Sequence, residues 1–363
     1  MSALSKGLLL VALLGLVLAT GACDREITRV EQVATAQNCF DCHSDNNTFL
    51  VAADQQWMRS KHASGDNLDR NSGSCVVCHT SEGFVASVTG GSVPGVVDNP
   101  TPIHCFTCHA PHTNADFSLR VTTNATLENG ATFDMGAGNL CVSCHHSRRN
   151  VETYVRTAND TVKVTSSHWG PHGSVQGDMV MGSNGYEYTG VNYFITEHRM
   201  ALSPVTQEAN ACLNCHKDVT SNLVLGGHSF NMKHIEAADT TFNTAACEGC
   251  HGDIGPNFNY QFTQTNIEGL LATLEAQLQA ANLIDAAGHP IGSSSNPRII
   301  ASSDSAGAMW NYLLAEEDRS HGIHNPMYMD GLLRSSIQFM QVGTPVSPQE
   351  YVATPGESHS GQR

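Results

Sequence analysis

The sequence predicts a mainly α fold with extensive loop and coil, closed by a helical segment at the C-terminal end. Three observations lead to this expectation. Six short cysteine-containing motifs begin at residues 39, 75, 105, 141, 212 and 247, a nearly regular spacing with one longer gap. Aromatic residues make up only 6% of the 363 residues, so side chains alone would form a thin core. Hydrophobic residues recur at helical spacing only in the last third of the chain.

The N-terminal segment has the pattern of an export signal. An apolar run over residues 8–18 is followed by four small residues and then by Cys23. The run is too short to span a bilayer, so residues 1–22 are predicted to be a signal peptide. The residues before Cys23 resemble a bacterial lipoprotein box, although Thr20 stands where that family usually has Leu. The resemblance implies a lipid on Cys23 that anchors the protein to a membrane. The alternative is ordinary cleavage after Ala22, which leaves a free thiol. Either way, we expect an exported protein of the periplasm, outer membrane or cell surface.

Each of the six motifs has the form Cys-x-x-Cys-His. Two cysteines three residues apart lie on the same side of one helical turn, where their thiols can add to the two vinyl groups of a haem. The next residue then lies beneath the ring, and its imidazole can bind the iron. The pattern therefore predicts six covalently attached haem c groups. The attachment cysteines and proximal histidines are Cys39, Cys42 and His43; Cys75, Cys78 and His79; Cys105, Cys108 and His109; Cys141, Cys144 and His145; Cys212, Cys215 and His216; and Cys247, Cys250 and His251.

Zinc sites and disulfide bonds are the alternative explanations of so many cysteines in an exported chain. Zinc knuckles group four ligands from two half-motifs at wider spacing. Neither zinc nor a disulfide requires a histidine directly after the second cysteine. Six complete motifs, with no incomplete copy, favour haem.

The chain resembles the exported multihaem c-type cytochromes of metal-respiring anaerobic bacteria. The resemblance is carried by the six motifs and by four short segments that are similar to haem-ligand loops of that group. It implies an array in which the haems form the core. The four segments are His109-Ala110-Pro111-His112; Ser167-His168-Trp169-Gly170-Pro171-His172, followed by Gly177-Asp178-Met179; Gly227-His228-Ser229-Phe230; and Gly322-Ile323-His324-Asn325-Pro326.

Histidines outnumber the places available for them. The chain has 19 histidines, six of them in the motifs, so 13 remain for six distal positions. This surplus favours two imidazoles on every iron, whereas methionine ligands would raise the reduction potential. The expected distal ligands are His62, His112, His168, His198, His228 and His324. His172 is a substitute for His168, and His104 or His146 is able to cap a neighbouring haem. The methionines near candidate sites are Met58, Met179, Met181, Met200 and Met232, which we expect to pack around rings.

The chain divides into two main regions. Residues 23–260 form the expected six-haem region, in which the long gap over residues 147–211 wraps two rings. Residues 261–342 form a helical region with three amphipathic stretches, whose apolar faces we expect to pack on one another and over the last haem. Residues 343–363 are rich in Pro, Ser, Gly and Glu and are expected to be a disordered tail.

The charge balance limits the function. Lys and Arg total 18 against 34 acidic residues, a formal charge of −16, which excludes nucleic acid as a partner. Six irons closed on both sides predict electron transfer between redox proteins, and the resemblance implies that other cytochromes are among these partners. An acidic surface favours partners with basic patches. One alternative is a multihaem reductase acting on nitrite, hydroxylamine or tetrathionate through one open iron. No Cys-x-x-Cys-Lys motif of such enzymes occurs. Another alternative is a subunit of an extracellular cytochrome filament, a homopolymer in which one copy caps a haem of the next.

Overall fold

The structure is a computed structural model that describes residues 44, 47–65, 67–114, 116–157, 159–200, 210–218 and 222–344. The expected signal peptide, Cys23, the first motif (Cys39, Cys42 and His43) and nearly all of the expected tail lie outside the described residues. Within the described ranges, no helix has both the length and the apolar character needed to cross a membrane.

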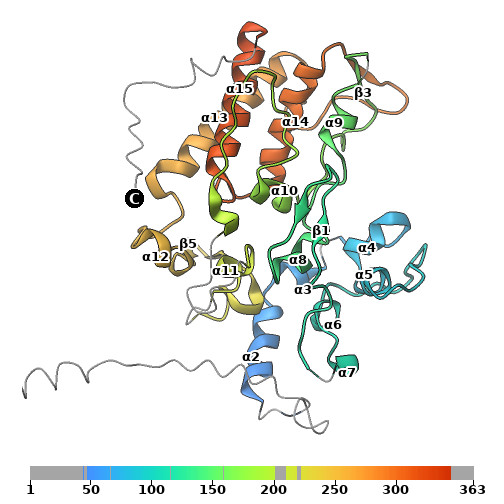
Figure 1. Ribbon diagram of the computed structural model, residues 1–363, viewed down its shortest axis with the longest axis vertical. Coiled ribbons are helices and arrows are strands. Elements are labelled where there is room, and N and C mark those ends of the chain that lie inside the picture. The colour runs from blue at the N-terminus through green and yellow to red at the C-terminus, as the bar shows by residue number, and fades with distance from the viewer. Residues whose placement is uncertain are drawn as a thin grey trace, which may run out of the picture.

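Short helices separated by long loops make up the described part of the expected haem region (Figure 1). Four of its five attachment motifs lie on or at the start of one of these helices, as the three-residue cysteine spacing predicts, and the motif that begins at Cys141 starts in α8 and runs past its end. The α-helices are α2 (Thr48–Trp57), α3 (Lys61–Ser64), α4 (Val76–His79), α5 (Ser81–Val88), α6 (Cys105–Cys108), α7 (Pro111–Asn114), α8 (Gly138–Val142), α9 (Val151–Tyr154), α10 (Gln176–Met181), α11 (Leu213–His216) and α12 (Ala245–His251). The 3-10 helices are η2 (Gly73–Cys75), η3 (Glu197–Met200), η4 (Gly227–Ser229) and η5 (Tyr260–Phe262).

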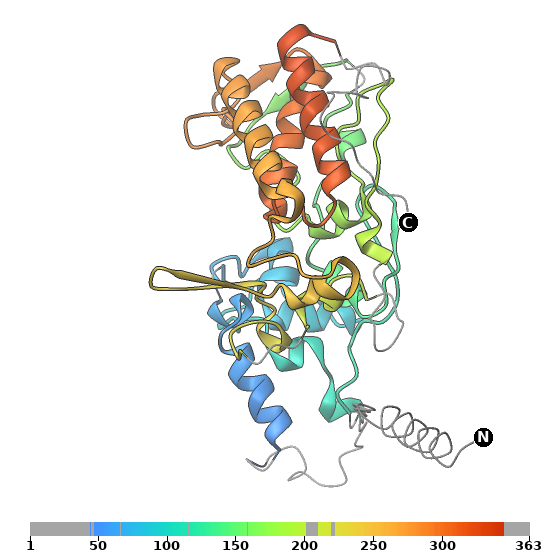
Figure 2. The same ribbon diagram turned by 90° about the vertical axis from the view of Figure 1, so that its left-hand side faces the viewer.

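Three small antiparallel sheets connect parts of the chain. They pair β1 (Ala125–Thr126) with β2 (Thr132–Phe133), β3 (Val162–Val164) with β6 (Arg298–Ile300), and β4 (Lys233–Glu236) with β5 (Asp239–Phe242). The β3–β6 pair joins the long inter-motif segment to the C-terminal region, with Val162 opposite Ile300. The β4–β5 hairpin projects sideways from the body of the protein (Figure 2).

The C-terminal region contains the three helices that the sequence predicts. They are α13 (Thr263–Ala280), α14 (Ser303–Asp318) and α15 (Pro326–Val342), which lie together at one end of the molecule (Figure 1). Side chains cap two of the helix starts: Ser302 accepts a hydrogen bond from the backbone of Ser305, and Asn325 from that of Tyr328. Pro326 at the first turn of α15 needs no hydrogen-bond acceptor.

The main hydrophobic core lies between these helices and the long inter-motif segment. Trp169 stacks on Tyr154 with ring centres 5.4 Å apart and meets Trp310 edge-on at 6.0 Å. The indole of Trp310 donates a 2.8 Å hydrogen bond to the carbonyl of Asn184. A smaller cluster around Phe133 and Val142 lies next to α8. These aromatic rings form one cluster in the main core. The fold class predicted from the sequence, mainly α with extensive loop, is confirmed.

Candidate haem sites

All ten cysteines of the five described motifs are free thiols, and all are exposed or half-buried. None of them forms a disulfide bond. Within the part of the chain that the structure describes, no three His, Cys, Asp or Glu side chains converge as a metal ion would require. Each site is named below after its attachment histidine.

Each of the five described attachment histidines faces one histidine from outside the motifs. The two rings of a pair come from segments that are distant in the sequence. In no such pair do two attachment histidines face each other. The distances between ring centres are 6.4 Å for His79 and His172, 6.5 Å for His109 and His228, 6.2 Å for His145 and His62, 6.2 Å for His216 and His324, and 6.0 Å for His251 and His198.

These separations fit two imidazoles that bind opposite sides of one metal ion. An imidazole nitrogen lies about 2 Å from a metal that it binds and about 1.1 Å from the centre of its own ring. Two such imidazoles therefore have ring centres roughly 6.2 Å apart. All five distances lie within a few tenths of an ångström of this value. The residues present thus fit an iron between each pair, with two free thiols beside it.

Hydrogen bonds orient several of these rings. An oxygen that can only accept receives the proton of Nδ1, which leaves Nε2 free to bind a metal. His109 donates to the carbonyl of Phe117 at 2.6 Å, and His216 to that of Phe230 at 2.9 Å. The remaining Nδ1 partners are the carbonyls of Ile323 for His198 and Gly173 for His172, the side-chain oxygen of Gln176 for His145, and a carboxylate oxygen of Asp318 for His324.

Burial keeps most of these imidazoles neutral, which is the form that binds a metal. Burial lowers the pKa of His62, His216 and His228 to about 4. His324 differs from them. Burial disfavours its protonation, but the charge of Asp318 and the hydrogen bond to it outweigh this effect and raise the pKa of His324.

Four of the six expected distal histidines lie opposite an attachment histidine, namely His62, His198, His228 and His324. For the His79 site, the ring that lies opposite belongs to His172, the substitute, whereas His168 is exposed. The segment is not helical there, because the backbone of His172 has a φ of 73°. His112 is exposed, with its ring centre 5.2 Å from that of Phe106.

The other two substitutes have different partners. His104 accepts a hydrogen bond from the backbone of Phe106 and caps the start of α6. Both ring nitrogens of His146 are engaged, Nδ1 with the carbonyl of Ser147 and Nε2 with the guanidinium of Arg148. Among the methionines, Met179 is fully buried in the main core.

The attachment sites lie close to one another. The thiols of Cys78 and Cys144 share a hydrogen bond, which brings the His79 site next to the His145 site. The thiols of Cys141 and Cys212 do the same for the His145 and His216 sites. Burial, and then the charge of Cys141, raise the pKa of Cys108 to about 12. Burial, and then the charge of Cys247, raise the pKa of Cys215 to about 11.

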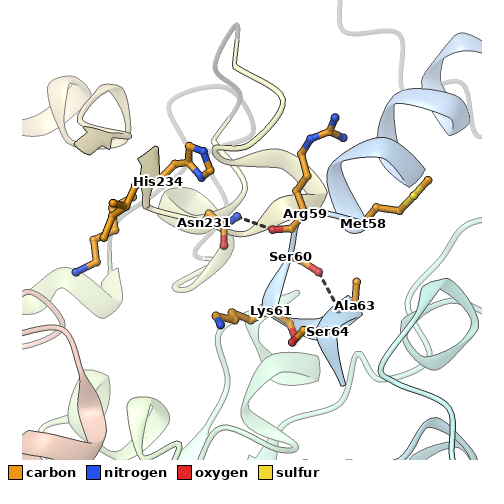
Figure 3. A pocket seen from close by; sticks show the side chains of 10 residues that line it. Met58, Arg59, Ser60, Lys61, Ala63, Ser64, Asn231 and His234 are labelled. Atoms are coloured by element: carbon orange, nitrogen blue, oxygen red, sulfur yellow. Dashed lines mark hydrogen bonds between the residues drawn. The ribbon is translucent and has the colours of Figure 1, made fainter. Parts of the chain in front are cut away.

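A basic recess lies near the sequence neighbours of His62 (Figure 3). This cavity of about 540 Å³ lies between the chain around α3 and strand β4. Its lining includes Arg59, Lys61 and Lys233 and no acidic residue, although the chain as a whole carries a charge of −16. Lys61 and Ala63, the neighbours of His62 in the sequence, both line it. Such a recess is suited to carboxylate groups, of which each haem carries two.

Two residues that support the pairs are absent from the sequence-based expectations. Asp318 and Gln176 each bond the Nδ1 of a paired histidine. The amide of Gln176 also donates to the carbonyls of Glu317 and Asp318 at the end of α14. No motif marks either residue. The only signal is their position. Gln176 directly precedes the segment Gly177-Asp178-Met179, and Asp318 stands at the end of an amphipathic stretch.

Comparisons with known proteins gave two similar solved structures. One is the outer cell wall cytochrome OcwA, at 20% identity and a TM-score of 0.48, over 79% of this chain and 50% of that one. Another is the undecahaem cytochrome from the S-layer of Carboxydothermus ferrireducens, at 15% identity and a TM-score of 0.40, over 81% of this chain and 40% of that one. The chain thus spans half or less of their length. No protein-family model and no curated protein sequence matched.

Proposed function

We propose that this protein is an exported electron-transfer protein that carries six covalently attached c-type haems, each closed on both sides by imidazole. One observation carries the proposal: each of the five described attachment histidines faces a second histidine at 6.0 to 6.5 Å between ring centres. A closed iron exchanges electrons but has no vacant position for a substrate. When bound, each haem supplies the reversible one-electron chemistry of its iron.

In this proposal the cysteine pairs hold the haems and the facing histidines hold the irons. The distal residues are His172, His228, His62, His324 and His198 for the His79, His109, His145, His216 and His251 sites, respectively. His112 and His168 remain from the expected set, and the first motif, Cys39, Cys42 and His43, lies outside the described residues. The thiols and imidazoles fix each ring, while backbone carbonyls and the side chains of Gln176 and Asp318 orient the imidazoles.

The order of the sites suggests a branched path for electrons. The His145 site adjoins the His79 and His216 sites through the Cys78–Cys144 and Cys141–Cys212 thiol contacts. Cys108 lies near Cys141, which places the His109 site next to the His145 site. Cys215 lies near Cys247, which places the His251 site next to the His216 site. We infer that the His145 site is the branch point. Electrons that travel between it and the His251 site cross the His216 site.

The exposed ends of this path fit contact with other redox proteins. Cys75, Cys105 and Cys250 of the three outer sites are exposed, whereas both cysteines of the His145 site are half-buried. The net charge of −16 favours partners with a basic patch, such as cytochromes of that kind, and makes the encounter dependent on salt. In this proposal a lipid on Cys23 keeps the exported chain at a membrane or cell surface.

The test uses the mature holoprotein purified from a host that attaches c-type haems. Intact mass gives the number of haems, and low-temperature electron paramagnetic resonance gives their axial ligands. We expect six haems with only low-spin ferric signals, and a reduced spectrum that carbon monoxide leaves unchanged.

Three results would contradict the proposal in different ways. A colourless protein would show that no haem is attached. A high-spin iron that binds nitrite or carbon monoxide favours the multihaem reductase. Regular fibres of wild-type protein in electron microscopy, with a sixth distal histidine supplied by the neighbouring copy, favour the filament.

A further inference from the structure

The imidazole of His324 has a partner unlike those of the other paired histidines. Its Nδ1 lies 2.7 Å from a carboxylate oxygen of Asp318, whose side chain is completely buried. In the other five described pair members with an assigned Nδ1 contact, the acceptor is uncharged. It is a backbone carbonyl for four of them and the side-chain amide of Gln176 for His145.

Asp318 is held firmly in this position. Its second carboxylate oxygen accepts a hydrogen bond from the hydroxyl of Ser320, and the same hydroxyl accepts one from the backbone of His324 at 3.2 Å. Asp318 ends α14, and its backbone carbonyl accepts from Gln176. The carboxylate and the imidazole are therefore fixed by one short turn between α14 and α15.

A carboxylate acts differently from an amide in this place. It draws the Nδ1 proton more strongly, so the imidazole donates more electron density through Nε2 to a metal. Its buried negative charge also favours the more highly charged state of a nearby iron, because solvent screens it little. Both effects stabilise ferric over ferrous iron and lower the reduction potential.

We propose that Asp318 lowers the reduction potential of the haem at Cys212 and Cys215 below that of its neighbour at Cys141 and Cys144. The proposal rests on the function proposed above. Asp318 acts through His324 as a positioning residue. The matching residue at the neighbouring His145 site is Gln176, which makes the same kind of contact without a charge. The His216 site lies between the branch point and the His251 site. An electron that moves onto its haem therefore goes to a lower reduction potential, so Asp318 makes this transfer unfavourable in free energy.

The test compares two reciprocal variants of the holoprotein in a potential-controlled spectroscopic titration. Asp318→Asn keeps the shape but removes the charge, and we expect one of the six transitions to move upward. At a fixed applied potential, the ratio of reduced to oxidised iron at that site should rise at least tenfold, which is 59 mV for one electron. Gln176→Glu adds a carboxylate at the His145 site, and we expect a different transition to move downward. Each change should also shift one low-spin ferric resonance.

A third variant is the control for charge alone. Asp330→Asn removes a half-buried carboxylate that pairs with Arg334 at 2.9 Å within α15. It should leave all six transitions in place. An equal shift in this variant, or unchanged transitions in Asp318→Asn with all haems attached, would overturn the proposal.

If Asp318→Asn loses a haem, the Gln176→Glu variant tests the proposal alone. In that case Gln176→Glu still has to lower one potential, and an unchanged titration counts against the proposal. Failure of the proposed function gives a separate result, because the wild-type protein would then lack six low-spin haems before any variant is made.

Discussion

The ring of His62, in α3, lies 6.2 Å from the ring of His145, which follows α8. The two rings are inclined at 69°. The same arrangement recurs at four other attachment histidines, and each partner comes from a distant part of the chain. A metal bound between such rings joins segments that would otherwise be held by few buried side chains. We therefore expect the haem region to depend on its cofactors for stability.

Removing His62 should open one iron and leave the others closed. In the His62→Gly holoprotein we expect about one sixth of the iron to become high-spin and to bind carbon monoxide after reduction, because the distal position then has no protein ligand. Low-temperature resonance and a carbon monoxide difference spectrum measure this. His234→Gly, a change in β4 at the edge of the same basic recess, is the control and should stay fully low-spin. A low-spin His62→Gly protein with six haems would contradict the assignment.

The segment between Ser167 and His172 allows a direct choice between two histidines. His172→Gly should open the iron at Cys75 and Cys78, because its ring lies 6.4 Å from that of His79. His168→Gly should leave every iron closed, because that side chain is exposed. The same two spectra are compared for both variants. The reverse pattern would restore His168 as the distal ligand.

The sequence alone predicts the attachment chemistry but not the choice among surplus histidines. Five described motifs begin or end short helices as their cysteine spacing requires, because that geometry is local. The choice between His168 and His172 depends on tertiary packing. Burial of Trp169 fixes the loop, and Gly170 and His172 adopt positive φ values of 140° and 73°, so helical spacing is no guide there.

The polar partners of the paired rings are likewise invisible in the sequence. Gln176 reaches His145 across 31 positions, and Asp318 reaches His324 across a turn between two helices. The low aromatic content of the whole chain also says little about where a dense core forms. Tyr154, Trp169 and Trp310 gather in one cluster, so the C-terminal region has a dense core although the chain as a whole is poor in rings.

Two glycines in the C-terminal helices test the packing of this core. A Cβ at Gly307 in α14 would overlap the ring of Tyr186, whereas a Cβ at Gly269 in α13 would meet nothing within 4 Å. Gly307→Ala should lower the free energy of unfolding by about 1–3 kcal/mol through overpacking. Gly269→Ala should raise it by about 0.5–1 kcal/mol, since alanine loses less backbone entropy in a helix. Denaturant titration of both holoproteins measures the difference, and equal effects would contradict the packing described here.

The raised pKa of the Asp178 carboxyl leads us to expect that stability changes with pH. Its side chain is completely buried, and burial raises its pKa to about 6, although one oxygen accepts a 2.6 Å hydrogen bond from the backbone of Ser147. A carboxyl whose folded pKa is raised contributes stability that is full below its unfolded pKa of about 4 and is lost as pH rises through the folded pKa.

The free energy of unfolding should therefore fall between pH 4 and pH 6 by up to about 3 kcal/mol for this group. Asp178→Asn keeps an oxygen for Ser147 but cannot ionise, so its stability should fall less over the same interval. Urea unfolding of both holoproteins at pH 4, 5, 6 and 7 measures the two curves. Parallel curves would mean that Asp178 ionises in the folded protein as it does in the unfolded chain.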